Sequence, residues 1–222
     1  MLLSREDAEL VFKLHCALMQ YVMEQVQGAG APAPTAAYPS LPPEQRQEVV
    51  KALLGRLDLI DTFIAAKPAS LSAEDLEIVS SWRHLLSGRF IVLRQLKKYM
   101  VLLACDEKST AYGVTGLVDP LELVIPMPLP AMIETVLLPF RDKIIYDGLV
   151  SAFNVTFGPG SRRGFEEGFR AAKADKGIVT SLPWEPPEHS ASDTAPNSKT
   201  FRSSLPKKQR FNQHEKLTGP CG

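Results

Sequence analysis

The longest stretch of extended character in this chain runs from Gly88 to Gly158, and it limits what the chain can fold into. It opens with an apolar run over residues 90–104, which is interrupted only by polar side chains between positions 94 and 98. Strands in globular proteins are usually about five or six residues long, so this run is too long for one ordinary strand. We therefore predict two strands, or one long bent strand, with the break near residues 95–98.

The rest of this stretch predicts three further strands, over residues 111–117, 143–150 and 152–157. Because Asp147-Gly148 falls inside the second of them, a tight hairpin turn is the alternative there. Between these strands, the sequence predicts a short helical turn after Asp119-Pro120. It also predicts a short helix that Pro130 opens and that continues through Leu137.

Three amphipathic helices are predicted before the sheet, over residues 4–27, 43–66 and 72–86, because apolar residues recur there at the helical period. Ser4 and Ser72 are predicted N-caps, each followed three residues later by an aspartate in capping-box position. The intervening residues 28–43 are rich in Ala, Pro and Gly, which is typical of a linker.

One more helix, capped by Ser161 and running to about residue 174, is predicted after the last strand. The chain is therefore predicted to be an α+β protein, in which the N-terminal helices pack with a strongly bent antiparallel sheet of four or five strands. We expect a helical region over residues 1–87, a sheet module with its closing helix over residues 88–183, and a disordered tail over residues 184–222. The tail is predicted from its Pro, Ser, Thr, Asn and charged residues, which offer little apolar surface to bury.

Composition narrows the classes of function. The formal net charge is +0, which argues against a surface coated in positive charge and leaves room for a local basic patch. Cys16, Cys105 and Cys221 are far apart and form no C-x-x-C pair, so we expect reduced cysteines, no metal site and no cofactor. Acidic residues near the N-terminus and the lack of a long apolar run predict neither a secretory signal nor a membrane span, and hence a cytoplasmic protein.

Several short motifs occur in a fixed order across residues 70–183. They are Leu96-Lys97-Lys98, the segment from Tyr112 to Leu117, Leu138-Pro139-Phe140, the segment from Ile144 to Leu149, and the segment from Gly177 to Leu182. In these motifs the chain resembles a group of cytosolic bacterial proteins without an assigned activity. Some members end in a Cys-rich zinc motif, whereas this chain ends Gly219-Pro220-Cys221-Gly222. The resemblance implies one family module and transfers no catalytic residue.

A turn at residues 158–163 is one candidate for chemistry. Its glycines lie between a predicted strand and a predicted helix, where backbone N–H groups can approach an anion, and Arg162 and Arg163 add positive charge. The spacing fits neither the dinucleotide fingerprint nor a P-loop. One alternative is thus an enzyme or binder that acts on a small phosphorylated ligand with Tyr146, Asp147, Arg162 and Arg163. For Asp147, the simpler interpretation is a turn residue that bonds its own backbone ahead of Gly148.

Basic residues in the sheet module are the other candidate. Arg94, Lys97, Lys98, Arg162 and Arg163 could contact a nucleic-acid backbone while strand tyrosines stack on bases; the alternative is a solvated face. We therefore expect a non-enzymatic binding or regulatory module whose partner is protein or nucleic acid, with no membrane partner. A third option is a structural subunit that forms homo-oligomers through its first helix.

Overall fold

The structure is a computed structural model that describes residues 2–27, 36–106, 109–125 and 127–184. All of these residues belong to one compact unit, residues 1–186. The linker prediction falls partly, and the tail prediction almost wholly, outside the described residues. The α+β class is confirmed, and within the described residues one helix follows the last strand.

The described residues before the sheet form four helices: α1 (Arg5–Gln27), α2 (Pro43–Gly55), α3 (Asp58–Ala66) and α4 (Ala73–Ser81), with 3-10 turns η1 (Tyr38–Ser40) and η2 (Trp82–His84). The predicted helix over residues 43–66 is therefore two helices. The chain leaves the helical conformation at Arg56, with φ −143° and ψ 63°, directly after Gly55, a poor helix former.

The two predicted N-caps behave differently. Ser72 forms a full capping box with Asp75, as predicted. Ser4 accepts a hydrogen bond from the amide of Asp7 at 3.1 Å. The Asp7 carboxylate instead forms an ion pair with Arg141, at 2.5 Å between Oδ1 and Nη1, which ties the start of α1 to the sheet.

The sheet has six strands, more than the four or five predicted. They are β1 (Leu86–Gln95), β2 (Met100–Ala104), β3 (Ala111–Thr115), β4 (Ala131–Phe140), β5 (Lys143–Tyr146) and β6 (Ser151–Phe153). The predicted break at residues 95–98 is the turn between β1 and β2. A short helix, α5 (Leu121–Val124), lies between β3 and β4, and α6 (Pro159–Asp175) follows β6.

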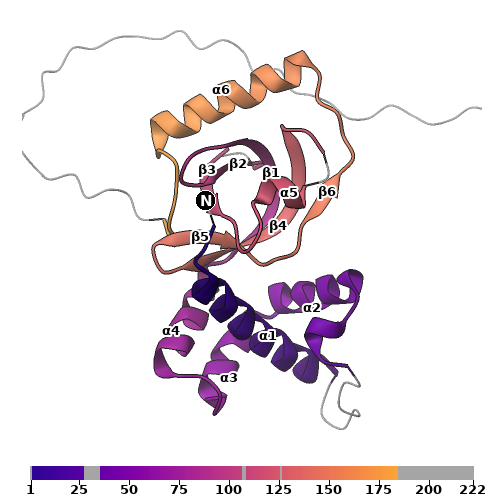
Figure 1. Cartoon of the computed structure of the whole chain (residues 1–222), viewed down its shortest axis with the longest axis vertical. Coiled ribbons are helices and arrows are strands. Elements are labelled where there is room, and N and C mark those ends of the chain that lie inside the picture. Colours follow the sequence, from indigo (N-terminus) through magenta and orange to yellow (C-terminus); the bar gives the residue numbers. More distant parts are fainter. Residues whose placement is uncertain (1, 28–35, 107–108, 126, 185–222) are drawn as a thin grey trace, which may run out of the picture. The chain divides into compact units, whose positions relative to one another are not determined.

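The first five strands close into a barrel (Figure 1). Their order is β1-β2-β3-β5-β4, and β4 returns to pair with β1. Phe90 thus lies between Ala104 of β2 and Ile133 of β4. Placing the fourth strand beside the first is the Greek-key connection. One pair, β3 with β5, is parallel, so the sheet is mixed and not wholly antiparallel as predicted.

The helix predicted from Pro130 to Leu137 is wrong, because these residues belong to β4. Alternate residues of β4 point to opposite sides, and its β-branched Ile133, Thr135 and Val136 favour a strand. Pro139 inside β4 lies opposite Ile144. The cap predicted for the last helix is also wrong: α6 begins after Gly158, which supplies no side-chain cap, and Ser161 lies in its first turn.

Alternation along β1, β2 and β3 separates the barrel interior from a face that α6 covers. Phe90, Val92, Met100, Leu102 and Val114 point inward and belong to the main core. Their neighbours form a smaller cluster against α6, which contains Ile91, Leu93, Val101, Leu103, Ala111, Phe165, Phe169 and Ala172. The strand β2 is therefore buried on both sides.

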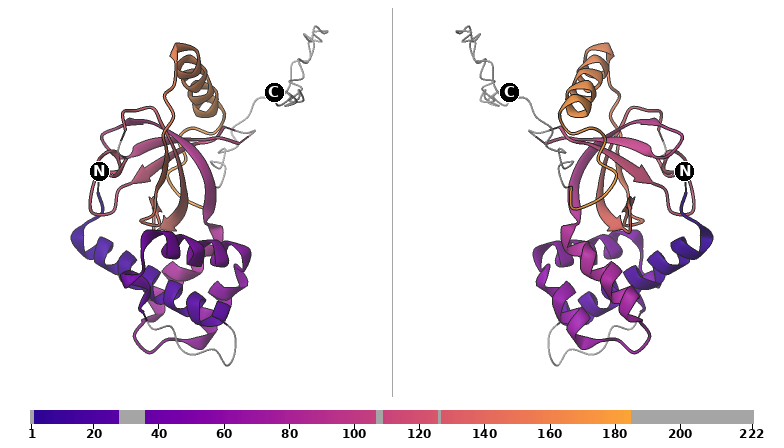
Figure 2. Two further views of the ribbon diagram at one scale, coloured as in Figure 1. Left: turned by 90° about the vertical axis from the view of Figure 1, so that its right-hand side faces the viewer. Right: turned by 90° about the vertical axis from the view of Figure 1, so that its left-hand side faces the viewer.

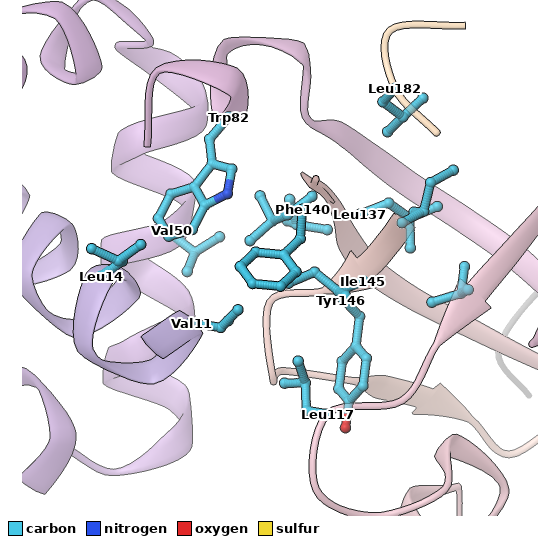
Figure 3. Close-up of a cluster of buried hydrophobic side chains, with 14 of the residues drawn as sticks. Val11, Leu14, Val50, Trp82, Leu117, Leu137, Phe140, Ile145, Tyr146 and Leu182 are labelled. Atoms are coloured by element: carbon cyan, nitrogen blue, oxygen red, sulfur yellow. The ribbon is translucent and has the colours of Figure 1, made fainter. Parts of the chain in front are cut away.

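The N-terminal helices cover a different side of the barrel, along β4 and β5 (Figure 2). The indole Nε1–H of Trp82 donates a hydrogen bond to the carbonyl oxygen of Pro139 at 3.1 Å. Figure 3 shows Trp82 beside Phe140, with Leu14 and Val50 from α1 and α2 nearby. Ile144 and Ile145 are both fully buried, because one faces the barrel interior and the other this helical layer.

Candidate functional site

The predicted basic residues do not form one surface of free charges. Arg94 forms an ion pair with Glu166 of α6, and its guanidinium lies over the ring of Phe169, 5.3 Å from the centroid. Arg94 therefore helps to hold α6 on the barrel. Lys97 and Lys98 are exposed in the turn between β1 and β2, which a hydrogen bond from the Leu96 amide to the Tyr99 carbonyl closes at 2.8 Å.

Arg162 and Arg163 are exposed in the first turn of α6. The Nε–H of Arg162 donates to the carbonyl oxygen of Phe157 at 3.0 Å, a contact within the same turn. Among the described residues, no hydrogen bond or ion pair joins either arginine to Tyr146 or Asp147. A phosphate site that uses all four residues stays a prediction.

Tyr146 and Asp147 follow one another at the end of β5 but have different surroundings. Tyr146 lies opposite Leu137, and Figure 3 places its ring beside Leu117. Burial, followed by the nearby charges of Asp119 and Asp147, raises the pKa of Tyr146 to about 12. Its phenol is therefore neutral at physiological pH, which leaves Asp147 as the titratable group of this pair.

The Asp147 side chain forms the turn predicted for it. Its Oδ1 accepts a hydrogen bond from the amide of Leu149 at 3.1 Å and lies 3.4 Å from the hydroxyl of Thr135. That hydroxyl lies closer, at 2.7 Å, to the carbonyl oxygen of Leu149. Gly148 has φ +88°, which L residues rarely adopt. The turn therefore fixes the carboxyl group in place.

Burial raises the pKa of Asp147 to about 7, although nearby backbone amides and the Thr135 hydroxyl partly offset this effect. Only 8% of the residue is exposed. The contacts with Leu149 and Thr135 both end at Oδ1, and the amides of Asp147 and Val136 also favour the charged carboxylate. Oδ2 accepts neither of the first two contacts and is not one of the buried atoms that lack a partner, so it is the oxygen that a ligand could reach.

A cavity of about 70 Å³ opens beside Asp147, between α2 and the strands β4 and β6. Its polar lining consists of Gln47, Lys51, Ser87, Glu134, Thr135, Asp147 and Ser151. Its apolar walls are Val50, Leu54, Val136 and Leu149. A smaller space of about 10 Å³ continues from the same walls and Asp147 toward His15 and Trp82. We call the larger space the Asp147 cavity.

Three further polar groups are buried behind this cavity. His15 Nε2, the Tyr38 hydroxyl and Arg46 Nε have no hydrogen-bond partner among the described residues. Burial and the charge of Arg46 lower the pKa of His15 to about 4, and burial is the main cause of the raised pKa of Tyr38. The sequence predicted His15 to be a packed core residue, but it gave no signal that Tyr38 and Arg46 would lie beside it.

A second hollow lies at the start of α1, where it meets the segment after β3. It has a volume of about 370 Å³ and is lined by Leu3, Arg5, Ala8, Glu9, Phe12, Leu117 and Val118. The amide of Leu3 donates to the carbonyl oxygen of Gly116 at 3.0 Å, and the Asp7–Arg141 ion pair holds the next turn. Both walls are therefore fixed to the barrel. We call this hollow the N-terminal groove.

The described residues contain no group of three or more His, Cys, Asp or Glu side chains placed to hold a metal ion. Within the same part of the chain, no helix has the length and apolar character needed to cross a membrane. The sequence matches no protein-family model and no curated protein, and the structure matches no solved structure.

Proposed function

We propose that this protein is a non-enzymatic binding module that recognises an apolar segment of another protein through the N-terminal groove. The observation that carries this proposal is the exposure of large apolar side chains there: Phe12 is 43% exposed and Val118 is 58% exposed. Contiguous exposed apolar surface marks sites of protein interaction more often than isolated exposed residues do.

The chemistry of the groove favours an amphipathic helix as the bound segment. Its floor is apolar, and its rim carries Arg5 and Glu9, which form an ion pair with each other at 2.8 Å and remain largely exposed. A partner helix could place apolar residues of one face in such a groove while its polar face stays in water. Because the walls are already fixed, binding would require little reordering of this chain.

The proposal is tested by photo-crosslinking from position 12 in the native host, followed by binding of a synthetic peptide that covers the crosslinked segment. We expect Phe12→Asp and Val118→Asp to weaken peptide binding at least roughly tenfold, because each buries a charge in an apolar contact. Val155→Asp is the matched control, since Val155 is 46% exposed and does not line the groove. Equal binding by the groove variants and the control would contradict the proposal.

Nucleic-acid binding is the second candidate function, and the shape of the barrel favours it. Five-stranded Greek-key barrels of the OB type bind oligonucleotides on the face of strands 2 and 3 and through the loop between strands 1 and 2. Here that loop carries the exposed Lys97 and Lys98. This is an argument from fold alone, and α6 covers the strand face, so phosphate contacts at the loop would have to supply the affinity.

A salt titration tests this second candidate. If Lys97 and Lys98 contact phosphates, binding to single-stranded nucleic acid weakens steeply as salt increases. Lys97→Glu and Lys98→Glu should each reduce the affinity and flatten that dependence, whereas Lys67→Glu, an exposed change in the helical half, should have less effect. The same effect for all three variants would mean that the loop is not the contact.

A further inference from the structure

We propose that the Asp147 cavity binds a small primary ammonium ion, with an N–H group of the ligand donated to Oδ2 of Asp147. The ligand class is a short alkylamine whose carbon chain contacts the apolar walls. This site is independent of the N-terminal groove, because the two share no lining residue.

Geometry is the first support for a ligand at this position. Oδ1 accepts a hydrogen bond from the Leu149 amide and lies near the Thr135 hydroxyl, while neither of these groups reaches Oδ2. Oδ2 is not one of the buried atoms that lack a partner, so it is open to the cavity, where an ammonium group could supply a strong, charge-assisted hydrogen bond. Asp147 also lines both the cavity and its inner extension, so the carboxyl group lies where a ligand could reach it.

The size of the cavity limits the ligand. About 70 Å³ corresponds to roughly five water-sized positions, at about 10–15 Å³ for each. A propylammonium ion, with its four heavy atoms, fits that limit. Its carbon atoms would contact Val50, Leu54, Val136 and Leu149, whose burial by the ligand contributes hydrophobic free energy.

The charges around the cavity favour a cation over an anion. Asp147 and Glu134 are the acidic groups of the lining, and Lys51 is its basic group. The ammonium group of Lys51 already pairs with Glu48 at 2.7 Å, and Glu134 lies 3.7 Å from Arg89. Behind Asp147, His15 is neutral at physiological pH because its pKa is lowered to about 4. The charge of Arg46 contributes to that shift at His15 and opposes a cation nearby, but Arg46 is not among the groups that shift the pKa of Asp147.

The affinity should depend on pH in a defined direction. The pKa of Asp147 is raised to about 7 without a ligand, so the fraction of charged carboxylate increases between about pH 6 and pH 8. An ammonium ligand prefers the charged form and therefore binds more tightly as the pH rises through this range. By linkage, the bound ligand must lower the pKa of Asp147.

Binding is measured by NMR titration of the full chain with propylammonium and, separately, with the neutral 1-propanol. We expect propylammonium to bind at least roughly tenfold more tightly than 1-propanol at pH 8, because the charged hydrogen bond is lost with the alcohol. Asp147→Asn should abolish this preference while keeping the turn, because its amide oxygen can still accept from Leu149. Glu134→Gln, at the mouth of the cavity, should reduce binding only slightly.

Equal affinity for the amine and the alcohol, or an unchanged preference in a folded Asp147→Asn variant, would overturn the proposal. If that variant does not fold, the proposal is tested on the unmodified protein by following the pKa of Asp147 through its carboxyl ¹³C resonance. Its apparent pKa must fall when propylammonium is added and must stay constant with 1-propanol. A pKa that does not respond to the amine would equally overturn the site.

Discussion

The barrel is covered on two sides, and the two covers differ in how they are built. The N-terminal helices contribute fully buried side chains such as Leu14, Ile60 and Trp82 to the same core as the residues of β4 and β5. On α6, Ala172 is buried, and Phe165 and Phe169 are only half-buried. The first cover is thus part of the main core, whereas the second is held by a small cluster and by Arg94.

The sequence of α6 reinforces this difference. Gly160, Gly164 and Gly168 lie within it, and glycine in a helix interior lowers stability relative to alanine. At Gly168 a Cβ would lie 3.4 Å from Leu103 Cδ2, an ordinary contact distance, so the packing does not require glycine there. The helix lies against the barrel but has a weak intrinsic tendency to form. Such an element can open locally while the barrel stays folded.

The largest expected effect is at Trp82, in the first cover. Trp82→Ala removes a fully buried ring and leaves the Pro139 carbonyl oxygen without its hydrogen bond. We expect the free energy of unfolding to fall by about 3–5 kcal/mol, measured by chemical denaturation. Trp184→Ala is the control, because Trp184 is 36% exposed and lies over Lys176 at the surface. A similar loss in both variants would mean that the helical layer is not part of the core.

The next effect depends on pH and comes from the polar groups that only the first cover buries. The pKa of Asp147 rises from 3.8 in the unfolded chain to about 7. The folded state therefore holds a proton that the unfolded state has lost, and this contribution to stability disappears as the pH rises from about 4 to 7. Folding lowers the pKa of His15 from 6.5 to about 4, so its contribution to stability increases as the pH rises through this range. The contributions of Asp147 and His15 therefore nearly cancel in the unmodified protein.

Asp147→Asn removes the contribution of Asp147 and leaves that of His15. Relative to the unmodified protein, the variant should gain stability as the pH rises from about 4 to 7, by roughly 1.4 kcal/mol for each pH unit and up to about 4 kcal/mol in total. Thermal unfolding measured across this pH range tests it. Asp142→Asn is the control, because Lys143 lowers the pKa of the exposed Asp142, which is therefore charged in both the folded and the unfolded chain across this range, so the difference from the parent should stay nearly constant with pH. A difference between variant and parent that does not change with pH would contradict the burial of Asp147.

The second cover should respond locally. Phe169→Ala removes a ring that contacts both the small cluster under α6 and Arg94. We expect amide hydrogen exchange across residues 159–175 to accelerate by roughly 10- to 100-fold, as expected for losing about 1–3 kcal/mol of apolar burial. Amides of β4 and β5 should keep their protection. Glu167→Ala, at an exposed position of α6, should leave the exchange unchanged, and uniform acceleration throughout the chain would show that the two covers unfold together.

The parts of the fold that could be predicted from the sequence are those that depend on residues close together in the chain. The break between β1 and β2 and the capping box at Ser72 depend on residues close together in the chain, and both are confirmed. The strand β4 was missed because Pro130 was interpreted as the first residue of a helix. Its conformation depends on pairing with β1, more than 30 residues away, as in Phe90 with Ile133.

The candidate site shows the same limit. The turn at Asp147 follows from the local sequence Asp147-Gly148, which the structure reproduces. The cavity beside it does not, because Gln47, Ser87 and Ser151 come from three distant segments. The hydrogen bond from Gln47 Nε2 to Ser151 Oγ, at 2.8 Å, joins residues 104 positions apart. No periodicity or motif in the sequence predicts such a contact, so the cavity could not be inferred from the sequence alone.

The smallest effect is expected at the ion pair that links α6 to the barrel. The side chains of Arg94 and Glu166 are 41% and 43% exposed, so solvent screens much of their attraction. A double-mutant cycle with Arg94→Ala and Glu166→Ala should give a coupling energy of about 0.2–1 kcal/mol.

Arg94→Lys sharpens the test, because lysine keeps the charge but loses the flat guanidinium over Phe169. If Arg94→Lys destabilises α6 as much as Arg94→Ala does, then contact with the ring holds this cover more than charge does. A coupling energy of several kcal/mol would instead show that α6 is fixed as firmly as the N-terminal helices, and the distinction between the two covers would fail.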